Sequence, residues 1–449
     1  MANEKKIIKN FFDDVPLTKK HKEIVILIGI AMLCELADNY NFSLVAPTLR
    51  EYWGVSVQQI GFIGSLFGIG MLLGTIFWGI ISDKFGRRKA IIISAVFFSI
   101  ASIIDGFAPN ITIFAIFRFL TAFGIAGVSI VSFSYMMEML PCKDRGRICG
   151  LTMSIGMLGM PLVAILCNVI LPHGGDAWRY IYYLGGIGLL IAAFGARLFK
   201  ESPRWLVQQG RVKEAEKVVS EIVGDNYVVD LSEKVCISGE TGNSVLFKEI
   251  LSELFKKKNL KNTSVLIIAT LSSLCGGLVF MTFAPTILTD TGFSMEQSLF
   301  LGTVVSFGLI LGPIITTVIS EWGGRKLPIT WTIIFLGIGL VLFGLTKNII
   351  VLCGIGAFVG AMHEASIVMV NSYAPETLGG RTRNSAASVV SACGRLVSTI
   401  AVSTFPVLYG SLGAMKAWWV LGAICVVGGL YVGVFGKRTS GVCLEDLEE

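Results

Sequence analysis

Charged residues are scarce in this sequence. Asp, Glu, Lys and Arg make up 15% of its 449 residues and apolar residues 53%, whereas a soluble domain usually carries about 25% charged residues. The composition therefore argues against a soluble globular protein. The net charge of +6 comes from basic residues spread between apolar runs, so nucleic acid is not an expected partner.

Patterns that carry catalysis or hold metals are also missing. The chain has three His and ten Cys, with no Cys-x-x-Cys pair and no metal-ligand spacing between Cys and His. It has no phosphate-binding Walker A loop and no nucleophile spaced for a base. We expect no cofactor, no metal and no enzymatic activity. A secretory signal is not expected either, since the first 23 residues are polar.

Long apolar runs dominate instead. A helix needs about 20 apolar residues to cross the bilayer core. Twelve segments qualify: 22–48, 59–82, 89–108, 111–140, 146–171, 177–198, 262–289, 296–320, 327–346, 349–374, 384–411 and 415–436. We therefore predict an all-α membrane protein with twelve transmembrane helices in the lipid bilayer. Its predicted parts are an N-terminal six-helix bundle (1–198), a cytoplasmic linker (199–261) and a C-terminal six-helix bundle (262–449).

Basic residues predict the orientation. Thirty of the 37 Lys and Arg residues fall in the two termini or in loops that follow even-numbered segments. The opposite side carries only Arg50, Arg179, Lys347 and Lys416. Because cytoplasmic loops are enriched in Lys and Arg, both termini and the linker are predicted to be cytoplasmic. The short external loops favour a bacterial inner membrane.

The linker contains helix signals of its own. Ser202-Pro203 is typical of a helix N-cap followed by Pro at the first helical position. Residues 211–222 alternate apolar and charged residues at helical spacing, which favours a short amphipathic helix on the cytoplasmic surface. Residues 244–255 favour another. The alternative is a solvated linker with nascent helices.

A shift of 238 residues brings motifs of the two halves into register. Ala46–Thr48 falls on Ala284–Thr286, Ser82–Arg87 on Ser320–Arg325, and Ser134–Arg145 on Ser372–Arg383. One offset in three separate segments predicts two parallel halves related by an axis along the membrane normal, with a pathway between them. Several charged residues have no charged counterpart in the other half and are candidates to act on an asymmetric solute. They are Glu35, Asp38, Arg118, Glu364 and Arg395.

Ionisable residues at bilayer depth are costly, so they point to function. Asp38 and Arg118 are predicted to lie at similar depth and could form a switchable ion pair. Protonation of Asp38 would free Arg118, and the pair would re-form when the proton leaves. A permanent structural ion pair is the alternative. Glu35 lies on the same helix face as Asp38, as a second proton carrier or as a polar residue in a wet part of the cavity.

Arg395, near the middle of segment 384–411, could bind a substrate carboxylate bidentately or pair with Glu364 or Glu35. Glu364 is a pathway candidate in its own right, and its neighbour His363 is expected to face a different direction. The other substrate-binding candidates are Asn39, Tyr40 and Asn41. The aromatic side chains that could line a pocket with Tyr40 are Phe42, Phe280, Phe283, Phe307 and Trp331.

The loop Gly79-Ile-Ile-Ser-Asp83-Lys-Phe-Gly86-Arg87-Arg88-Lys89 resembles the signature loop of the major facilitator superfamily. Gly86 permits a tight turn there, and Asp83 can accept hydrogen bonds from helix N-termini and Arg groups. The segment Arg118–Gly127 resembles the Arg/Gly motif of the family's fourth helix. The resemblance implies the major facilitator fold, with two pseudo-symmetric six-helix bundles working as a monomer.

The segment Glu201-Ser-Pro-Arg204-Trp-Leu206 resembles the sugar-porter and organic-ion branches of that superfamily, as do the pairs Glu138–Arg145 and Glu376–Arg383. In those branches such residues form a cytoplasmic ion-pair network that holds the outward-facing state. The alternative is a set of surface ion pairs, each contributing about 0–1 kcal/mol. The cytoplasmic gate that this implies comprises Asp83, Gly86, Arg87, Glu138, Arg145, Glu201, Arg204, Glu321, Arg325, Glu376 and Arg383.

The likeness to sugar porters does not continue into the pathway, because Leu271–Leu288 contains no Gln or Asn. The segment Ala37-Asp38-Asn39-Tyr40-Asn41 instead resembles the motif of organic-acid–proton symporters, with Asn41 in place of the motif's second Asp. We therefore predict a secondary active transporter that takes up a small organic solute, an organic anion, together with protons. The rival interpretations are a proton-coupled drug or organic-cation exporter, a sugar–proton symporter and a non-transporting membrane receptor.

Overall fold

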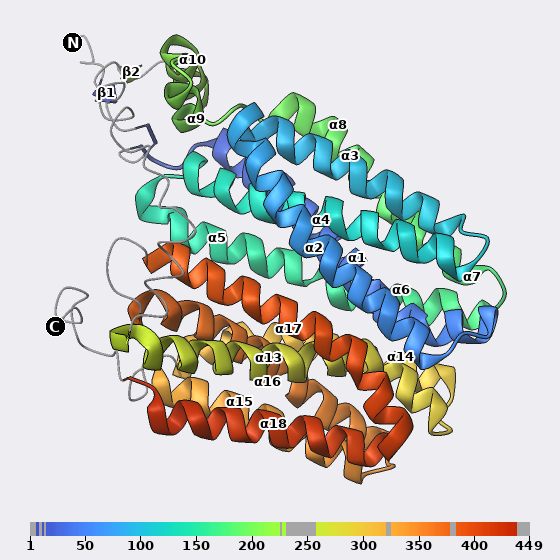
Figure 1. The fold of residues 1–449 in the computed structure, drawn as a ribbon. Coiled ribbons are helices and arrows are strands. Elements are labelled where there is room, and N and C mark those ends of the chain that lie inside the picture. The colour runs from blue at the N-terminus through green and yellow to red at the C-terminus, as the bar shows by residue number, and fades with distance from the viewer. Residues whose placement is uncertain are drawn as a thin grey trace. The chain divides into compact units, whose positions relative to one another are not determined.

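The structure is a computed structural model that describes residues 6–8, 11–12, 15–224, 227–229, 257–319, 325–377 and 383–437. Within these ranges the chain is almost wholly helical (Figure 1). The helix predicted at 244–255 lies outside the described residues.

The predicted membrane segments all appear as helices. The first half contains α1 (Lys19–Trp53), α2 (Val57–Phe85), α3 (Arg87–Gly106), α4 (Ile111–Met139), α5 (Cys142–Met157), α6 (Gly159–Ile170), α7 (Ala177–Tyr183) and α8 (Ile187–Leu198). The second half contains α13 (Lys257–Asp290), α14 (Met295–Ile319), α15 (Lys326–Leu345), α16 (Ile349–Thr377), α17 (Arg383–Leu412) and α18 (Ala414–Phe435).

Ten helical stretches in the described residues are long and apolar enough to cross a membrane. α1 and α17 are also long enough, with 35 and 30 residues, and they carry the charged residues Glu35, Asp38 and Arg395. The predicted twelve-helix membrane fold is confirmed, and the protein is a multi-pass integral membrane protein.

Two of the predicted segments are interrupted rather than continuous. Segment 146–171 breaks at Leu158, between α5 and α6. Pro161 follows at once and has no amide hydrogen with which to continue the helical ladder. Segment 177–198 contains a 3₁₀ turn (Leu184–Gly186) between α7 and α8, and a second such turn (Leu171–His173) follows α6.

The predicted helices of the linker are confirmed as α9 (Pro203–Gln208) and α10 (Val212–Val223). The Ser202 hydroxyl accepts a hydrogen bond from the amide of Trp205 at 3.3 Å and so caps α9. α10 buries one apolar face, formed by Ala215, Val219 and Ile222. A parallel pairing of β1 (Lys6–Ile8) with β2 (Tyr227–Val229) was not predicted.

The internal repeat is visible in the helix packing. A Cβ atom on Gly70 of α2 would lie 2.5 Å from the carbonyl oxygen of Phe119 in α4, and one on Gly308 of α14 would lie 2.2 Å from that of Ala357 in α16. These two contacts are related by the offset of 238 residues at both ends. Gly74 with Phe123 and Gly312 with Ala361 repeat the pattern four residues later.

A contact between symmetry-related residues supports the same offset. The Ser43 hydroxyl of α1 donates to the carbonyl of Met281 in α13, and these residues are 238 positions apart. This contact lies inside the second compact unit and joins equivalent positions of α1 and α13.

Two compact units emerge from the tertiary contacts. One comprises Met1–Asn39, Gly70–Gly159 and Tyr182–Ser244, and the other comprises Tyr40–Ile69, Met160–Ile181 and Val245–Glu449. The first holds the buried charges of the N-terminal half, and the second holds all of α13–α18. The boundaries at 198 and 262 stay a prediction.

We expect Gly308→Val to destabilise the protein, because a side chain there would enter the backbone of α16. Overpacking of this kind costs roughly 1–3 kcal/mol. Gly354→Val on α16 is the matched control, since nothing lies within 4 Å of its Cβ position. Thermal unfolding of the purified protein should show a clearly lower midpoint for Gly308→Val only. Equal midpoints for the two variants would contradict the close α14–α16 contact.

His21 at the start of α1 predicts a dependence of stability on pH. Its ring is buried, lies edge-on to Phe12 at 5.0 Å and accepts from the Thr18 amide at 3.1 Å. Burial lowers the pKa of His21 to about 4. In the unfolded chain the His pKa is near 6.5. Between pH 6.5 and pH 4, His21 is therefore protonated in the unfolded chain and neutral in the folded protein.

The stability that neutral His21 contributes is fully present above pH 6.5 and is lost as the pH falls toward 4. Between pH 7 and pH 4.5 the wild type should lose on the order of 1–3 kcal/mol more unfolding free energy than His21→Gln. Unfolding measured across this pH range checks the difference. Parallel pH profiles for the two proteins would show that His21 is not buried as described.

Candidate functional site

A buried ion pair lies at the centre of the first compact unit. The guanidinium of Arg118 in α4 donates from Nη1 to Oδ1 of Asp38 at 2.5 Å and from Nη2 to the Asp38 carbonyl at 2.6 Å. The Arg118 side chain is 0% exposed and that of Asp38 2%. The predicted contact between these two residues is therefore present, and it is shielded from solvent.

Neighbouring helices fix the Asp38 carboxylate. The Ser102 hydroxyl of α3 lies 2.7 Å from Asp38 Oδ2 and 3.0 Å from the Tyr182 carbonyl. The Arg118 guanidinium lies over the Tyr182 ring at 5.6 Å. Gly185 leaves room for this cluster, because a Cβ atom there would lie 2.2 Å from the Ser102 hydroxyl and 2.9 Å from Asp38 Oδ2.

A second carboxyl, which the sequence analysis missed, belongs to the same buried region. Asp105 is 0% exposed and is the penultimate residue of α3. Its Oδ2 accepts from the Thr121 hydroxyl at 3.3 Å, and Oδ1 has no hydrogen-bond partner among the described residues. The charges of both Arg118 and Asp38 act on this carboxyl.

The other candidates on α1 lie in different surroundings. Glu35 is buried and accepts from the Ser129 hydroxyl of α4 at 3.0 Å. Tyr40 is buried and donates to the Gly302 carbonyl of α14 at 2.9 Å. Asn41 is buried, with no hydrogen-bond partner for Oδ1 in the described part of the chain. Asn39 is exposed.

The candidates in the second half are separated by their helix faces. His363 of α16 is buried, lies against Gly277 of α13 and has its Nδ1 3.0 Å from the Ser273 carbonyl. Glu364 lies beside Gly312 of α14 instead, so the two neighbours face different helices as predicted. Arg395 lies on α17 with an exposed side chain.

The aromatic candidates do not form one pocket. Phe280 packs edge-on against Phe343 and Trp418, and Phe283 packs against Phe405. These rings belong to the packed interior of the second unit. The remaining aromatic candidates divide into buried Phe42 and the exposed pair Phe307 and Trp331.

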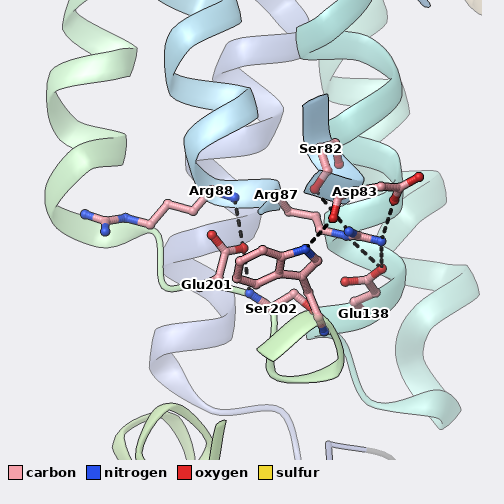
Figure 2. A network of polar contacts seen from close by, with 8 residues as sticks. Ser82, Asp83, Arg87, Arg88, Glu138, Glu201 and Ser202 are labelled. Carbon is pink, nitrogen blue, oxygen red and sulfur yellow. Dashed lines mark hydrogen bonds and ion pairs between the residues drawn. The ribbon is translucent and has the colours of Figure 1, made fainter. Parts of the chain in front are cut away.

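Arg87 links α2, α3 and α4 through a polar network (Figure 2). Its guanidinium donates to Glu138 at 3.1 Å and to the Ser82 carbonyl at 3.1 Å, and it pairs with Asp83 at 3.1 Å. Asp83 itself is 76% exposed, and its carbonyl accepts from the Trp205 indole of α9 at 2.8 Å. Arg87 thus joins three consecutive helices, and α9, from the linker, bonds to the backbone of one of them at Asp83.

The carboxylate at the N-terminus of α3 belongs to Glu201 rather than to Asp83. Glu201 Oε1 accepts from the amide of Arg88 at 3.2 Å and of Ser202 at 3.0 Å. Gly86 has a φ of 100°, and a Cβ atom on it would lie 2.3 Å from Glu201 Oε2, so Gly provides both the turn and the space. Burial raises the pKa of the Glu201 carboxyl, while the surrounding backbone amides oppose that change.

The remaining residues of the predicted gate are only partly described. Arg204 lies over the ring of Phe11 at 5.3 Å, and Arg325 immediately precedes α15. The side chains of Arg145, Glu376 and Arg383, and the whole of Glu321, lie outside the described part of the chain.

A polar contact that the sequence analysis did not predict joins α1, α13 and α17. Arg50 pairs with Asp290 at 2.5 Å, and Tyr409 donates to the other oxygen of that carboxylate at 3.1 Å. Ser65 of α2 and Ser403 of α17 contact each other at 2.5 Å. Both contacts lie inside the second compact unit and tie the two sequence halves together there.

Comparison with known proteins identifies the family. The model of the family described as "Sugar (and other) transporter" matches residues 9–449. The chain belongs to this family of the major facilitator superfamily. This transporter is 28% identical over 431 residues to the metabolite transport protein YyaJ of Bacillus subtilis, covering 96% of this chain and 95% of that one.

Other similar proteins extend the comparison. The niacin transporter NiaP of Acinetobacter baylyi is 24% identical over 97% of this chain and 98% of its own. Among solved structures, the inward-open xylose transporter XylE of E. coli matches with a TM-score of 0.76 and 21% identity, over 95% of this chain and 99% of that chain. The fold is thus shared over nearly the full length, and the protein is a sugar or metabolite transporter rather than an enzyme.

We expect Arg87→Gln to lower the unfolding free energy by about 1–3 kcal/mol, because Glu138 is left half-buried without its cation. Asp83→Asn removes a partner of the same arginine but changes an exposed group, so its effect should stay within about 0.5 kcal/mol. Thermal unfolding of the two purified variants tests the ranking. A larger loss for Asp83→Asn would show that the exposed pair dominates the network.

Proposed function

We propose that this transporter takes up a small organic anion together with protons. The observation that carries the proton coupling is the Asp38–Arg118 ion pair, because it is buried and one member can be neutralised by a proton. Breaking a buried pair leaves an uncompensated charge, which is strongly unfavourable. Protonation of Asp38 therefore makes a different arrangement of α1 and α4 favourable, and loss of the proton restores the pair.

Such a switch suits alternating access. The two halves share their scaffold, as the repeated glycine contacts indicate, whereas Asp38 and Arg118 are opposed by glycines in the repeat. Rocking of the halves about a central site is the usual motion of such inverted or parallel repeats. A proton bound in one half then biases that motion. We propose that both termini are cytoplasmic, because of the Lys and Arg distribution, and that the protein lies in a bacterial inner membrane, because its external loops are short.

An anionic solute is supported by Arg395, an exposed guanidinium on a membrane helix, which suits a carboxylate. Relatives named as a niacin transporter and a benzoate transport protein are consistent with it. A sugar is the second candidate. It is favoured by relatives named as an arabinose-proton symporter and a myo-inositol transporter, and by Asn41, whose buried amide oxygen has no partner in the described residues.

Proton flux into proteoliposomes distinguishes these solutes. The probes are nicotinate, benzoate, D-xylose, myo-inositol and tetraethylammonium, added to vesicles that contain a pH-sensitive dye. We expect nicotinate or benzoate to drive protons inward with the wild type. Arg395→Gln should reduce this flux at least tenfold, and Asp38→Asn should abolish it.

The alternatives give different patterns. Inward proton flux with D-xylose or myo-inositol, unchanged in Arg395→Gln, would replace the anion with a sugar. Outward proton flux with tetraethylammonium alone would indicate an organic-cation exporter. Lys416→Gln, a charge change in the first turn of α18, is the control for a general effect of removing a cation.

A further inference from the structure

With Asp105, the buried cluster around Arg118 contains two carboxyl groups and one guanidinium. Asp38 bonds to Arg118, Asp105 bonds to Thr121 one helical turn further along α4, and the side chains of Asp38, Asp105 and Arg118 are at most a few per cent exposed. A buried ionised carboxylate is stable only when it is paired and hydrogen-bonded. Arg118 is bonded to Asp38 through both terminal nitrogens, so the ionised form of Asp105 is the one left poorly compensated.

The hydrogen bonds agree with this assignment. Asp38 accepts from Arg118 and Ser102, each at 2.7 Å or less, as a carboxylate does. Within the described part of the chain, Asp105 has one hydrogen bond, with the Thr121 hydroxyl at 3.3 Å, and its Oδ1 has no partner. A neutral carboxylic acid requires fewer donors than a carboxylate, and it can itself donate to the Thr121 oxygen.

We propose that Asp105 holds the proton of this cluster while Asp38 holds Arg118, and that the two carboxyls exchange these roles during transport. In the exchange an O–H bond on Asp105 is broken and one on Asp38 is formed. Arg118 keeps its charge and moves from the Asp38 carboxylate to that of Asp105. One ionised carboxylate thus faces the guanidinium in either arrangement.

The groups that face Asp105 permit this exchange. Thr121 on α4 contacts Asp105, and the charges of Arg118 on α4 and Asp38 on α1 act on it. The ring of Tyr182 on α7 lies against the Arg118 guanidinium. The adjacent Tyr183 donates to the Gly106 carbonyl at 3.2 Å. Among these groups Arg118 is the one cation, and the two carboxyls are the groups that can pass a proton between them near neutral pH.

Infrared spectroscopy of the purified protein at pH 7 tests the proposal, because a protonated carboxyl has a C=O band that a carboxylate lacks. The wild type minus Asp105→Asn difference spectrum should show the loss of one such band, which shifts in deuterium oxide. The band should also be absent from Asp38→Asn, because Asp105 must then be ionised to pair with the Arg118 guanidinium. Asp290→Asn, a change of an aspartate outside the cluster, should leave the band in place.

A protonated-carboxyl band that Asp105→Asn retains at full intensity would overturn the proposal, and so would a band that Asp38→Asn retains. Thr121→Val provides a second test that leaves both carboxyls present. The band should persist in this variant and shift in frequency as the Thr121 contact is lost, whereas an unshifted band would contradict the assignment to Asp105.

The inference rests on the proposed proton coupling, but the spectra are independent of transport. Absence of proton flux with all five solutes would contradict the proposed function and leave the spectra to decide the role of Asp105.

Discussion

A guanidinium without access to water must always have an anion beside it, and Arg118 imposes that requirement on this protein. Arg cannot give up its proton in a protein, so the surrounding helices have to supply negative charge at short range. α1 supplies the Asp38 carboxylate, α3 supplies the Ser102 hydroxyl that donates to it, and the turn after α7 supplies space at Gly185. Under the proposed proton coupling, the positions of these three elements and of α4 depend on the charge states of Asp38 and Asp105.

The rest of the fold provides a scaffold that permits such charges. Glycines at equivalent positions of the two halves bring helices into backbone contact. Gly70 of α2 lies against the backbone of α4, and Gly308 of α14 lies against the backbone of α16. In lipid, where apolar burial gives little driving force between helices, close packing of small residues holds the bundle together. The repeat thus accounts for the symmetric framework, whereas the ionisable residues at bilayer depth break the symmetry. The residues that we propose to couple protons to transport therefore lie where the two halves differ.

Most of the framework could be predicted from the sequence, because membrane helices require long apolar runs and repeats leave a constant offset. The Asp38–Arg118 contact followed from their predicted depths. Asp105 was missed because it falls at the end of its apolar segment, where a carboxylate looks like a loop residue; the unbalanced charge beside Arg118 became visible only with side chains in place. The Arg50–Asp290 pair was missed because pairing between distant helices depends on packing that spacing does not encode.

Local backbone details were predictable only where a residue type forces them. The Ser202 cap on α9 was anticipated from Ser-Pro, and the turn at Gly86 from its glycine. The sequence analysis expected Asp83 to accept from helix N-termini and Arg groups. Asp83 does pair with Arg87, whereas the Arg88 amide at the start of α3 bonds to Glu201, from a distant part of the chain. A residue that is distant in the sequence can thus occupy a position for which a local motif suggests a nearby residue.

The most direct test of the central claim compares two kinds of transport by Asp38→Asn, which mimics the protonated aspartate. Vesicles are loaded with the solute that drives proton flux in the wild type, and radiolabelled solute is followed with and without a proton gradient. The account predicts that the variant still exchanges solute without a gradient but no longer accumulates it when a gradient is imposed. Accumulation equal to that of the wild type would show that Asp38 is not the proton site, and loss of exchange as well would show that the ion pair is purely structural.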